Sequence, residues 1–333
     1  MKAFFINRYG KSDVLTLGEL TEPTLRDDDV LVQIHAAGVN PVDNKIRGGE
    51  FKLLLPYKMP LILGTDLAGV VVGVGPRVRR FKVGDEVYAR PDDDRIGTFA
   101  ELIAVKEGSL ALKPANLSME EAASIPLVAL TAWQTLFEKG GLKRGQKVLI
   151  HAGSGGVGTI AIQLAKHFGA TVATTASAVN TEMLKGLGAD IVIDYKKDDF
   201  SSKLKDYDLV IDTQGGDTLK RSLRVLKPGG RLIGIAGPPD PDFAKLRGAN
   251  VLVGLVMRLL SYGIRKAARR SNNSYSFHFM TANGQQLGEI TKLIEARLIR
   301  PVVDRVFPFE ETRQALAYVE TGRTKGKVVI KVR

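Results

Sequence analysis

The chain has 333 residues, of which 25% are charged and 44% hydrophobic, so it is long enough for two domains and too apolar for a disordered protein. It contains 48 Lys and Arg against 36 Asp and Glu, a net charge of +12, and no cysteine. The lack of cysteine excludes disulfide frameworks, cysteine-ligated zinc, iron-sulfur clusters and thiolate nucleophiles. The N-terminus lacks the apolar run of a secretory signal, so we expect a cytoplasmic protein.

The first 115 or so residues read as short strands separated by glycine. Residues 30–35, 67–74 and 84–88 are strand-like, and Gly-Pro and Gly-Asp turns lie between them. This pattern predicts a mostly β domain, either a sandwich or a partial barrel.

From about residue 119 the pattern changes to helices that alternate with apolar strands. Ser118 with Glu121 predicts a helix start, and Pro126 is expected at a break between two helices. Strands are predicted at 147–152, 171–175, 191–195, 209–212 and 231–235, and helices at 157–168, 182–187 and 218–226. Strands that are apolar at nearly every position are buried on both faces, so this α/β region is predicted to form a parallel, doubly wound sheet.

After Arg297 the sequence returns to strands, at 302–307 and 327–332, around a helix at 311–321. These pieces are expected to rejoin the N-terminal β domain. We therefore predict one domain from residues 1–118 and 298–333 and a second domain from residues 119–297.

A glycine-rich loop follows the strand that ends at Ala152. It fits the GxGxxG pattern, in which the first glycine permits a tight turn, the second admits a pyrophosphate, and the third lets the helix pack closely on the strand. The helix that follows offers amides and the positive end of its dipole to phosphates. We predict that a dinucleotide is bound by Gly153, Ser154, Gly155, Gly156, Val157 and Gly158.

The end of the second strand of this region predicts which dinucleotide is bound. An acid there would bind the ribose hydroxyls of NAD, but residues 174–180 contain no Asp or Glu. A 2'-phosphate would meet no negative charge, and Ser177 and Asn180 can donate hydrogen bonds to it. The sequence therefore favours NADPH over NADH, and Ser177 is also a suitable helix cap.

The motifs together carry a family resemblance. The β domain, Ala152 to Gly158, Leu130-Thr131-Ala132 and the ending Gly326-Lys327-Val328-Val329 resemble the medium-chain dehydrogenase/reductase superfamily. Within it the chain resembles the zinc-independent quinone oxidoreductase and enone reductase branch over essentially its whole length. The resemblance implies a GroES-like substrate domain, a Rossmann domain that binds NADPH, and an active-site cleft between them.

The resemblance also implies chemistry without a metal. Zinc-dependent alcohol dehydrogenases of this superfamily have a catalytic Cys and a Gly-His-Glu motif where this chain has residues 38–43 and 64–66, which contain neither Cys nor His. Without a Lewis acid, reduced nicotinamide still transfers hydride to an electrophilic acceptor, such as a quinone or the β-carbon of an α,β-unsaturated carbonyl. We therefore expect a reductase of one of these small molecules.

Roles for single residues follow from the resemblance alone. Asn40 is expected beside the nicotinamide, and Lys45 is the candidate that polarises the carbonyl or supplies a proton, although a solvated surface lysine fits this position equally well. Further cofactor contacts are expected from Thr131, Tyr195, Ile235, Ala236, Gly237 and Lys327. Among these, Tyr195 is placed near the 2'-phosphate, and Lys327 is expected to close over the cofactor.

Much of the excess positive charge lies in one segment, where seven Lys and Arg and no acid occur between Phe243 and Arg270. The spacing of Leu252, Leu255, Val256 and Leu259 predicts an amphipathic helix with a cationic flank. One interpretation is peripheral contact of residues 245–270 with an anionic membrane, and the other, which we favour, is a packed helix with solvated arginines. Nucleic acid is not expected, because no aromatic residues interleave with the charges.

Two alternatives to a quinone or enone reductase fit the same sequence. One is a noncatalytic NADPH-binding sensor or membrane-associated partner protein, and the other is a zinc-free dehydrogenase of a different carbonyl substrate. Either a monomer or a homodimer is compatible with the sequence.

Overall fold

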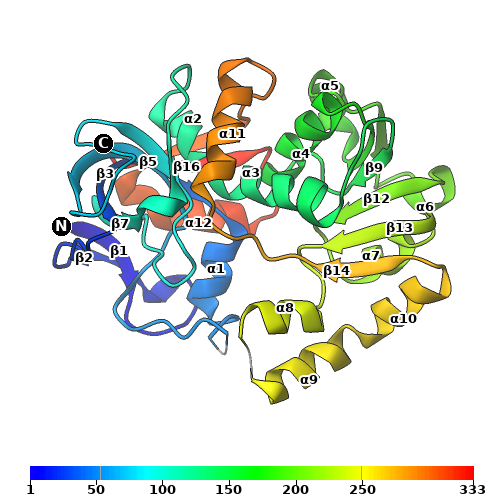
Figure 1. Ribbon diagram of the computed structural model, residues 1–333, viewed down its shortest axis with the longest axis horizontal. Coiled ribbons are helices and arrows are strands. Elements are labelled where there is room, and N and C mark those ends of the chain that lie inside the picture. The colour runs from blue at the N-terminus through cyan, green and yellow to red at the C-terminus, as the bar shows by residue number, and fades with distance from the viewer. Residues whose placement is uncertain (53, 249) are drawn as a thin grey trace. The chain divides into compact units, whose positions relative to one another are not determined.

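The computed structural model describes residues 1–52, 54–248 and 250–333, and the chain forms two compact units (Figure 1). The first unit contains Met1–Leu130 and Thr281–Arg333, and the second contains Thr131–Met280. These limits differ from the predicted domain boundaries at 118 and 298. The reason is that α2 (Met119–Ala123) packs on the main sheet of the first unit and α11 (Gly284–Glu295) packs on a strand of the same sheet.

The first unit is built on β strands. Its larger sheet has the order β15-β16-β3-β5-β6-β8, with β7 also paired to β3, and its smaller sheet has the order β2-β1-β4. The strands are β1 (Lys2–Ile6), β2 (Leu15–Glu19), β3 (Asp29–Val39), β4 (Leu61–Ile62), β5 (Asp66–Val74), β6 (Glu86–Ala89), β7 (Leu102–Lys106), β8 (Leu110–Leu112), β15 (Val303–Pro308) and β16 (Lys327–Lys331). Apolar side chains from both sheets form one core, which includes Phe4, Ile34 and Leu67.

Helices cover parts of this β structure. Besides α2 and α11, α12 (Thr312–Glu320) packs on its strands, and the unit also contains α1 (Pro41–Gly48) and the first turns of α3 (Pro126–Trp133). Ser118 and Glu121 form the predicted capping box of α2, with hydrogen bonds of 3.0 and 3.1 Å. Pro126 begins α3, which confirms the predicted break between two helices.

The second unit is a parallel six-stranded sheet with helices packed on it. Its strands are β9 (Lys147–Ile150), β10 (Thr171–Ala176), β11 (Ile191–Asp194), β12 (Tyr207–Asp212), β13 (Leu226–Gly234) and β14 (Ser274–Phe277), in the order β11-β10-β9-β12-β13-β14. All five neighbouring pairs are parallel. This strand order is that of the doubly wound dinucleotide-binding fold, so the predicted fold class is confirmed.

The helices of the second unit are α4 (Gly156–His167), α5 (Thr181–Gly186), α6 (Phe200–Lys203), α7 (Asp217–Ser222), α8 (Pro241–Leu246), α9 (Val251–Leu260) and α10 (Tyr262–Arg270), and residues 134–139 form a π-helical continuation of α3. Helix α4 packs on β9 and β10, and α7 packs on β12 and β13. Figure 1 shows α8, α9 and α10 following one another, with α10 beside the edge strand β14.

Three sequence expectations need correction. The helix predicted to reach Leu226 ends at Ser222, because Leu226 already pairs with Tyr207 as the first residue of β13. The basic segment forms two helices instead of one, since the chain turns at Ser261. The apolar side of α9 is exposed rather than packed in the core as we favoured.

Candidate functional site

The glycine loop connects β9 to α4. A Cβ at Gly153 would lie 2.1 Å from Oγ1 of Thr174, and a Cβ at Gly158 would lie 2.5 Å from the carbonyl oxygen of Ala152. Both positions therefore require glycine. Ala152 itself has a φ of 51°, a left-handed backbone conformation that residues other than glycine adopt at a cost of about 1–3 kcal/mol.

The start of α4 has room for phosphate groups. Around a Cβ at Gly155 the nearest atom would be the Ala152 carbonyl oxygen, at 3.4 Å, so the loop backbone is open to a ligand here. No side chain caps the N-terminus of α4 at Gly155. Amides of an uncapped first turn, together with the helix dipole, fit a pyrophosphate.

The expected adenosine contacts lie at the carboxyl ends of β10 and β11. Ser177 follows β10 and Tyr195 follows β11, and the register pairs Ala176 with Asp194, so the two strands end side by side. The Tyr195 amide donates to the Ala176 carbonyl at 3.2 Å, and Nδ2 of Asn180 donates to Oγ of Ser177, also at 3.2 Å. The structure thus brings Ser177, Asn180 and Tyr195 to one edge of the sheet.

Sequence reasoning missed two cations at the same edge. Lys196 and Lys197 are exposed and follow Tyr195 directly. Asp194 accepts a hydrogen bond from the Lys196 amide at 3.2 Å. Two lysines just after an apolar stretch predicted as a parallel strand were the signal available in the sequence, since phosphate sites gather at the carboxyl ends of such strands.

The expected nicotinamide-side segment follows β13. The Ile235 amide donates to the Asp212 carbonyl at 2.9 Å, and a Cβ at Gly237 would lie 2.5 Å from the Tyr275 hydroxyl. Ala236 between them is exposed. Asp212 closes the neighbouring loop by accepting from the amides of Gln214 and Gly215, and burial raises its pKa to about 6. Thr131 is buried within α3.

The first unit contains a second polar centre, which we name the Lys327 cluster and which consists of Asn40, Asp43, Thr65, Asp66 and Lys327. All five residues are buried. Asn40 follows β3, Asp66 begins β5 and Lys327 begins β16. Because β3 pairs with both other strands, Val39 with Val328 and Gly38 with Asp66, the register brings the three residues together at one end of the sheet.

Hydrogen bonds link the cluster completely. Nζ of Lys327 donates to Oδ1 of Asn40 at 2.5 Å, to Oδ2 of Asp66 at 3.0 Å and to the Val39 carbonyl at 3.2 Å. Nδ2 of Asn40 donates to Oδ2 of Asp66 at 2.8 Å and to Oγ1 of Thr65 at 3.1 Å. The ammonium of Lys327 therefore lies between the stretches 38–43 and 64–66 and donates to three oxygen acceptors.

Asp43 and Asp66 also stabilise helix starts. The Asn40 amide, at the N-terminus of α1, donates to Oδ2 of Asp43 at 2.7 Å, and Oδ1 of Asp43 accepts from the Thr65 hydroxyl at 2.9 Å. The Leu127 amide, in the first turn of α3, donates to Oδ1 of Asp66 at 2.7 Å. Negative charge near a helix N-terminus is favourable.

The cluster holds two carboxyl groups and one ammonium. Burial raises the pKa of Asp43 to about 7, against the hydrogen bonds from Asn40 and Thr65 and the charge of Lys327. Burial also raises the pKa of Asp66, against the charge of Lys327 and a hydrogen bond from Asn40. The cluster can therefore take up or release one proton near neutral pH.

The two predicted catalytic residues lie in different environments, one buried and one exposed. Asn40 lies in the Lys327 cluster, whereas Lys45 lies on the exposed side of α1, with its ammonium 3.9 Å from Glu50. Lys327, expected to close over the cofactor, has its ammonium buried against Asn40 and Asp66.

Three members of the cluster were not predicted as site residues, although Asp43, Thr65 and Asp66 lie in the two stretches compared with the zinc motifs. The sequence feature that could have indicated them is a carboxylate in each of these two stretches, next to an apolar strand. Among the described residues, no group of three or more His, Asp or Glu side chains is placed to hold a metal ion.

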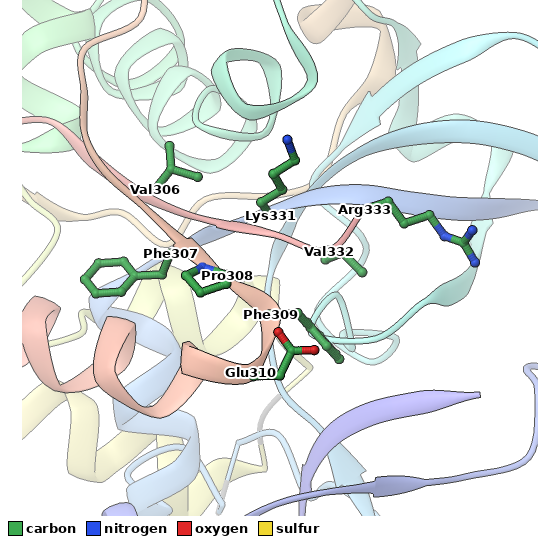
Figure 2. A pocket seen from close by; sticks show the side chains of 8 residues that line it. All are labelled: Val306, Phe307, Pro308, Phe309, Glu310, Lys331, Val332 and Arg333. Carbon is green, nitrogen blue, oxygen red and sulfur yellow. The ribbon is translucent and has the colours of Figure 1, made fainter.

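A separate hollow of about 350 Å³ lies on the first unit beside β15 and β16 (Figure 2). Its lining consists of Val306, Phe307, Pro308, Phe309, Glu310, Lys331, Val332 and Arg333. None of the predicted site residues lines it. No helix in the described part of the chain is long and apolar enough to cross a membrane.

Comparisons with known proteins match both units. Residues 26–115 match the alcohol dehydrogenase GroES-like domain, and residues 187–330 match the zinc-binding dehydrogenase family. The chain is 39% identical to a 2-methylene-furan-3-one reductase of Solanum lycopersicum over 99% of this chain and 79% of that protein. It is 35% identical to a mitochondrial NAD(P)H oxidoreductase, RTN4IP1, of Danio rerio, over 100% of this chain and 91% of that protein.

Solved structures agree with these matches. The quinone oxidoreductase from Coxiella burnetii superposes with a TM-score of 0.88 at 33% identity, over 100% of this chain and 99% of that one. Together with the GxGxxG loop on a parallel sheet, these matches confirm the predicted family. The chain belongs to the medium-chain dehydrogenase/reductase superfamily, in the branch that includes quinone oxidoreductases and enone reductases, and it is an NAD(P)H-dependent oxidoreductase.

Proposed function

We propose that the protein is an NADPH-dependent, zinc-independent reductase of quinones or of α,β-unsaturated carbonyls. The observation that carries the zinc-independent part is the Lys327 cluster. In the two stretches that correspond to the zinc motifs, the side-chain oxygens of Asn40 and Asp66 bind the ammonium of Lys327. A metal ion there would have to displace a buried positive charge, and the donors include no sulfur or imidazole, which catalytic zinc sites generally use.

The preference for NADPH rests on the edge formed by β10 and β11. Ser177 and Asn180 offer hydrogen-bonding groups where an acid would select NAD. Lys196 and Lys197 add exposed positive charge beside Tyr195. This combination suits a 2'-phosphate, which carries negative charge and accepts several hydrogen bonds.

The acceptor class follows from the zinc-independent mechanism proposed above. NADPH, when bound, supplies a hydride that adds to the β-carbon of an enone or to a quinone, and a proton then neutralises the oxygen on which the electron pair arrives. The tomato relative is named for a substrate in which a methylene group is conjugated with a ring ketone, and the Coxiella relative is named for quinones. Both acceptors are electrophilic without a Lewis acid.

The proposed roles of the chain's residues are of two kinds. Asn40 positions the nicotinamide side of the site, held in one orientation by its bonds to Lys327, Asp66 and Thr65. Lys45 polarises the acceptor carbonyl, for which its exposed ammonium is suited. The glycine loop at 153–158 holds the pyrophosphate.

Oxidation of NADPH and of NADH, followed through the nicotinamide absorbance, tests the proposal. The purified protein is dialysed against EDTA and assayed with one ortho-quinone, one para-quinone and one short enone. We expect turnover with NADPH, slower turnover with NADH and no gain on adding zinc. The products identify the bond that was reduced.

Other outcomes favour the alternatives. A rate that disappears with EDTA and returns with zinc would contradict the zinc-independent mechanism. Tight NADPH binding without turnover of any acceptor would favour a sensor. Reduction of a simple ketone or aldehyde, but not of the enone or the quinones, would favour a dehydrogenase of another carbonyl substrate.

A further inference from the structure

Helix α9 presents an apolar face to solvent. Six of its residues are between 52% and 88% exposed, namely Val251, Leu252, Leu255, Val256, Leu259 and Leu260. At 100° per residue these six positions fall within one half of the helix surface, and the buried residue Met257 lies on the opposite half. A patch of large aliphatic side chains of this kind marks an interaction site on a soluble protein.

Positive charge borders this face. Arg258 is exposed at the edge of the apolar arc, next to Val251 on the helix surface. Helix α10 follows at once, and Lys266, Arg269 and Arg270 on it are exposed. No acid occurs anywhere between Phe243 and Arg270. The patch therefore combines exposed aliphatic groups with cations that no acid of the same segment neutralises.

Helix α10 packs on the second unit, and α9 packs on α8 and α10. Ile264 and Ala268 of α10 are buried in its hydrophobic core. Oδ1 of Asn250 caps α9 by accepting from the Val253 amide at 3.0 Å. At Ser261 the hydroxyl donates to the Met257 carbonyl at 2.8 Å, which fixes the turn between the helices. The exposed face thus belongs to a capped helix that packs on α8 and α10.

The charges decide what fits this face. An anionic bilayer matches both properties, because aliphatic side chains enter the acyl boundary while Lys and Arg meet the headgroups. A second copy of this chain, bound through the same face about a twofold axis, would set the basic segment against itself. Such like-charge contacts are unfavourable, so the observations favour lipid over self-association.

We propose that α9 and α10 form a peripheral binding site for an anionic lipid bilayer. Helix α9 lies in the plane of the interface with Leu252, Leu255 and Leu259 directed into the acyl boundary. Arg258 and the cations of α10 contact the headgroups. The proposal is independent of the substrate that the enzyme reduces.

Sedimentation of the full-length chain with vesicles tests it. One set of vesicles contains phosphatidylcholine alone, and the other contains phosphatidylcholine with phosphatidylserine. We expect binding to the second set at low salt, weaker binding at high salt because headgroup charges are screened, and little binding to the first set.

Two double variants separate the contributions of the face. Leu252→Gln with Leu259→Gln should weaken binding to phosphatidylserine vesicles by about tenfold or more, since two inserted side chains are lost. Arg258→Gln with Arg270→Gln should weaken it by roughly fivefold for each cation removed, from about 1 kcal/mol per basic residue at an anionic surface. All four residues are exposed, so the fold and the rate with a soluble acceptor should not change.

Matched controls remove the same groups elsewhere. Val83→Gln with Leu112→Gln changes two exposed aliphatic residues of the first unit, and Lys220→Gln with Arg224→Gln removes two exposed cations of the second unit. Binding by these controls should stay close to that of the unchanged protein.

Three results would overturn the proposal. The first is no binding to phosphatidylserine vesicles at low salt. The second is binding that the controls weaken as much as the α9 variants do. The third is a dimer in sedimentation velocity that Leu252→Gln with Leu259→Gln converts to a monomer, because the face would then be an interface between copies.

Discussion

Lys327 and Asn40 are 287 positions apart in the chain, yet Nζ of Lys327 lies 2.5 Å from Oδ1 of Asn40. The contact depends on β3, which lies between β16 and β5 in the larger sheet. Strands β16 and β5 carry Lys327 and Asp66 to the same end of β3. The polar centre of the first unit is therefore assembled by strand register.

Removing the ammonium should destabilise the first unit. Lys327→Met leaves Asp66 and Asp43 buried without the positive charge, which costs about 3–5 kcal/mol for a buried pair. Urea unfolding measures the loss. Lys331→Met, four residues along the same strand, removes an exposed partner of Glu120 and should cost less than about 1 kcal/mol. An equal loss of unfolding free energy in the two variants would show that the buried ion pair of Lys327 stabilises the fold no more than the exposed pair of Lys331.

The stability of the protein should depend on Asp43 over a defined pH range. Its pKa is about 7 in the folded chain and 3.8 without the fold, so between these values the folded state holds more protons than the unfolded state. Stability contributed by the protonated group is therefore lost as the pH rises from about 4 to about 7, by about 4 kcal/mol at most.

Asp43→Asn tests this dependence, because it keeps a neutral group hydrogen-bonded to the Asn40 amide. Urea unfolding at a series of pH values should give a flatter curve for the variant than for the unchanged protein. Asp94→Asn, at an exposed acid, is the control and should leave the curve as it is. Parallel curves for Asp43→Asn and the unchanged protein would contradict the prediction.

A carboxylate at the end of β10 should change the cofactor preference. Ser177→Asp retains a residue type that caps a helix but places negative charge where a 2'-phosphate is expected. We expect kcat/KM with NADPH to fall by at least about tenfold, since like charges in contact cost several kcal/mol, while the value with NADH changes little. Ser12→Asp, at an exposed serine of the first unit, should affect neither cofactor.

A methyl group at Gly158 should disturb the phosphate loop. In Gly158→Ala the new Cβ would lie 2.5 Å from the Ala152 carbonyl and 2.6 Å from Cα of Gly153, so the loop must move. NADPH affinity, measured by calorimetric titration, should fall by about tenfold or more. Gly186→Ala, where no atom lies within 4 Å of the new methyl group, should keep full affinity. An unchanged affinity of Gly158→Ala would argue against this loop as the pyrophosphate site.

The two predicted catalytic residues are tested by kinetics. Lys45→Met removes an exposed ammonium and should lower kcat by tenfold or more, about 1.4 kcal/mol of transition-state stabilisation, without changing the unfolding midpoint. Asn40→Ala should lower kcat by a similar factor, and it should also lower stability because Asn40 binds Lys327 and Asp66. A smaller fall in kcat for Lys45→Met would show that another group polarises the carbonyl.

The fold was predictable where the signal is local. Apolar strands, the glycine loop and the capping box at Ser118 depend on neighbouring residues, and the structure confirms them. The end of α7 was not predictable, because Leu226 leaves the helix to pair with Tyr207, which is 19 positions earlier. The turn at Ser261 was not predicted either, because the nearby Gly263 lies inside α10 and does not mark the helix end.

In the candidate site, too, the parts set by local sequence were predictable and the parts set by strand register were not. The glycine loop and the ends of β10 and β11 follow a known order of strands, so their place in the fold was predictable from the sequence, although Lys196 and Lys197 were missed. The Lys327 cluster was not, because the register between β3, β5 and β16 decides which side chains meet. Sequence spacing alone carries no information on that register.

The position of β16 in the chain has a consequence for biosynthesis. The strand that supplies Lys327 leaves the ribosome only after all of residues 131–280 have been made. The second unit is continuous in sequence and can fold as it is synthesised. In contrast, β3 can pair with β16 only after the second unit has been synthesised. Until β16 is synthesised, Asp43 and Asp66 lack the ammonium of Lys327. The first unit therefore begins to be synthesised before the second but is completed after it.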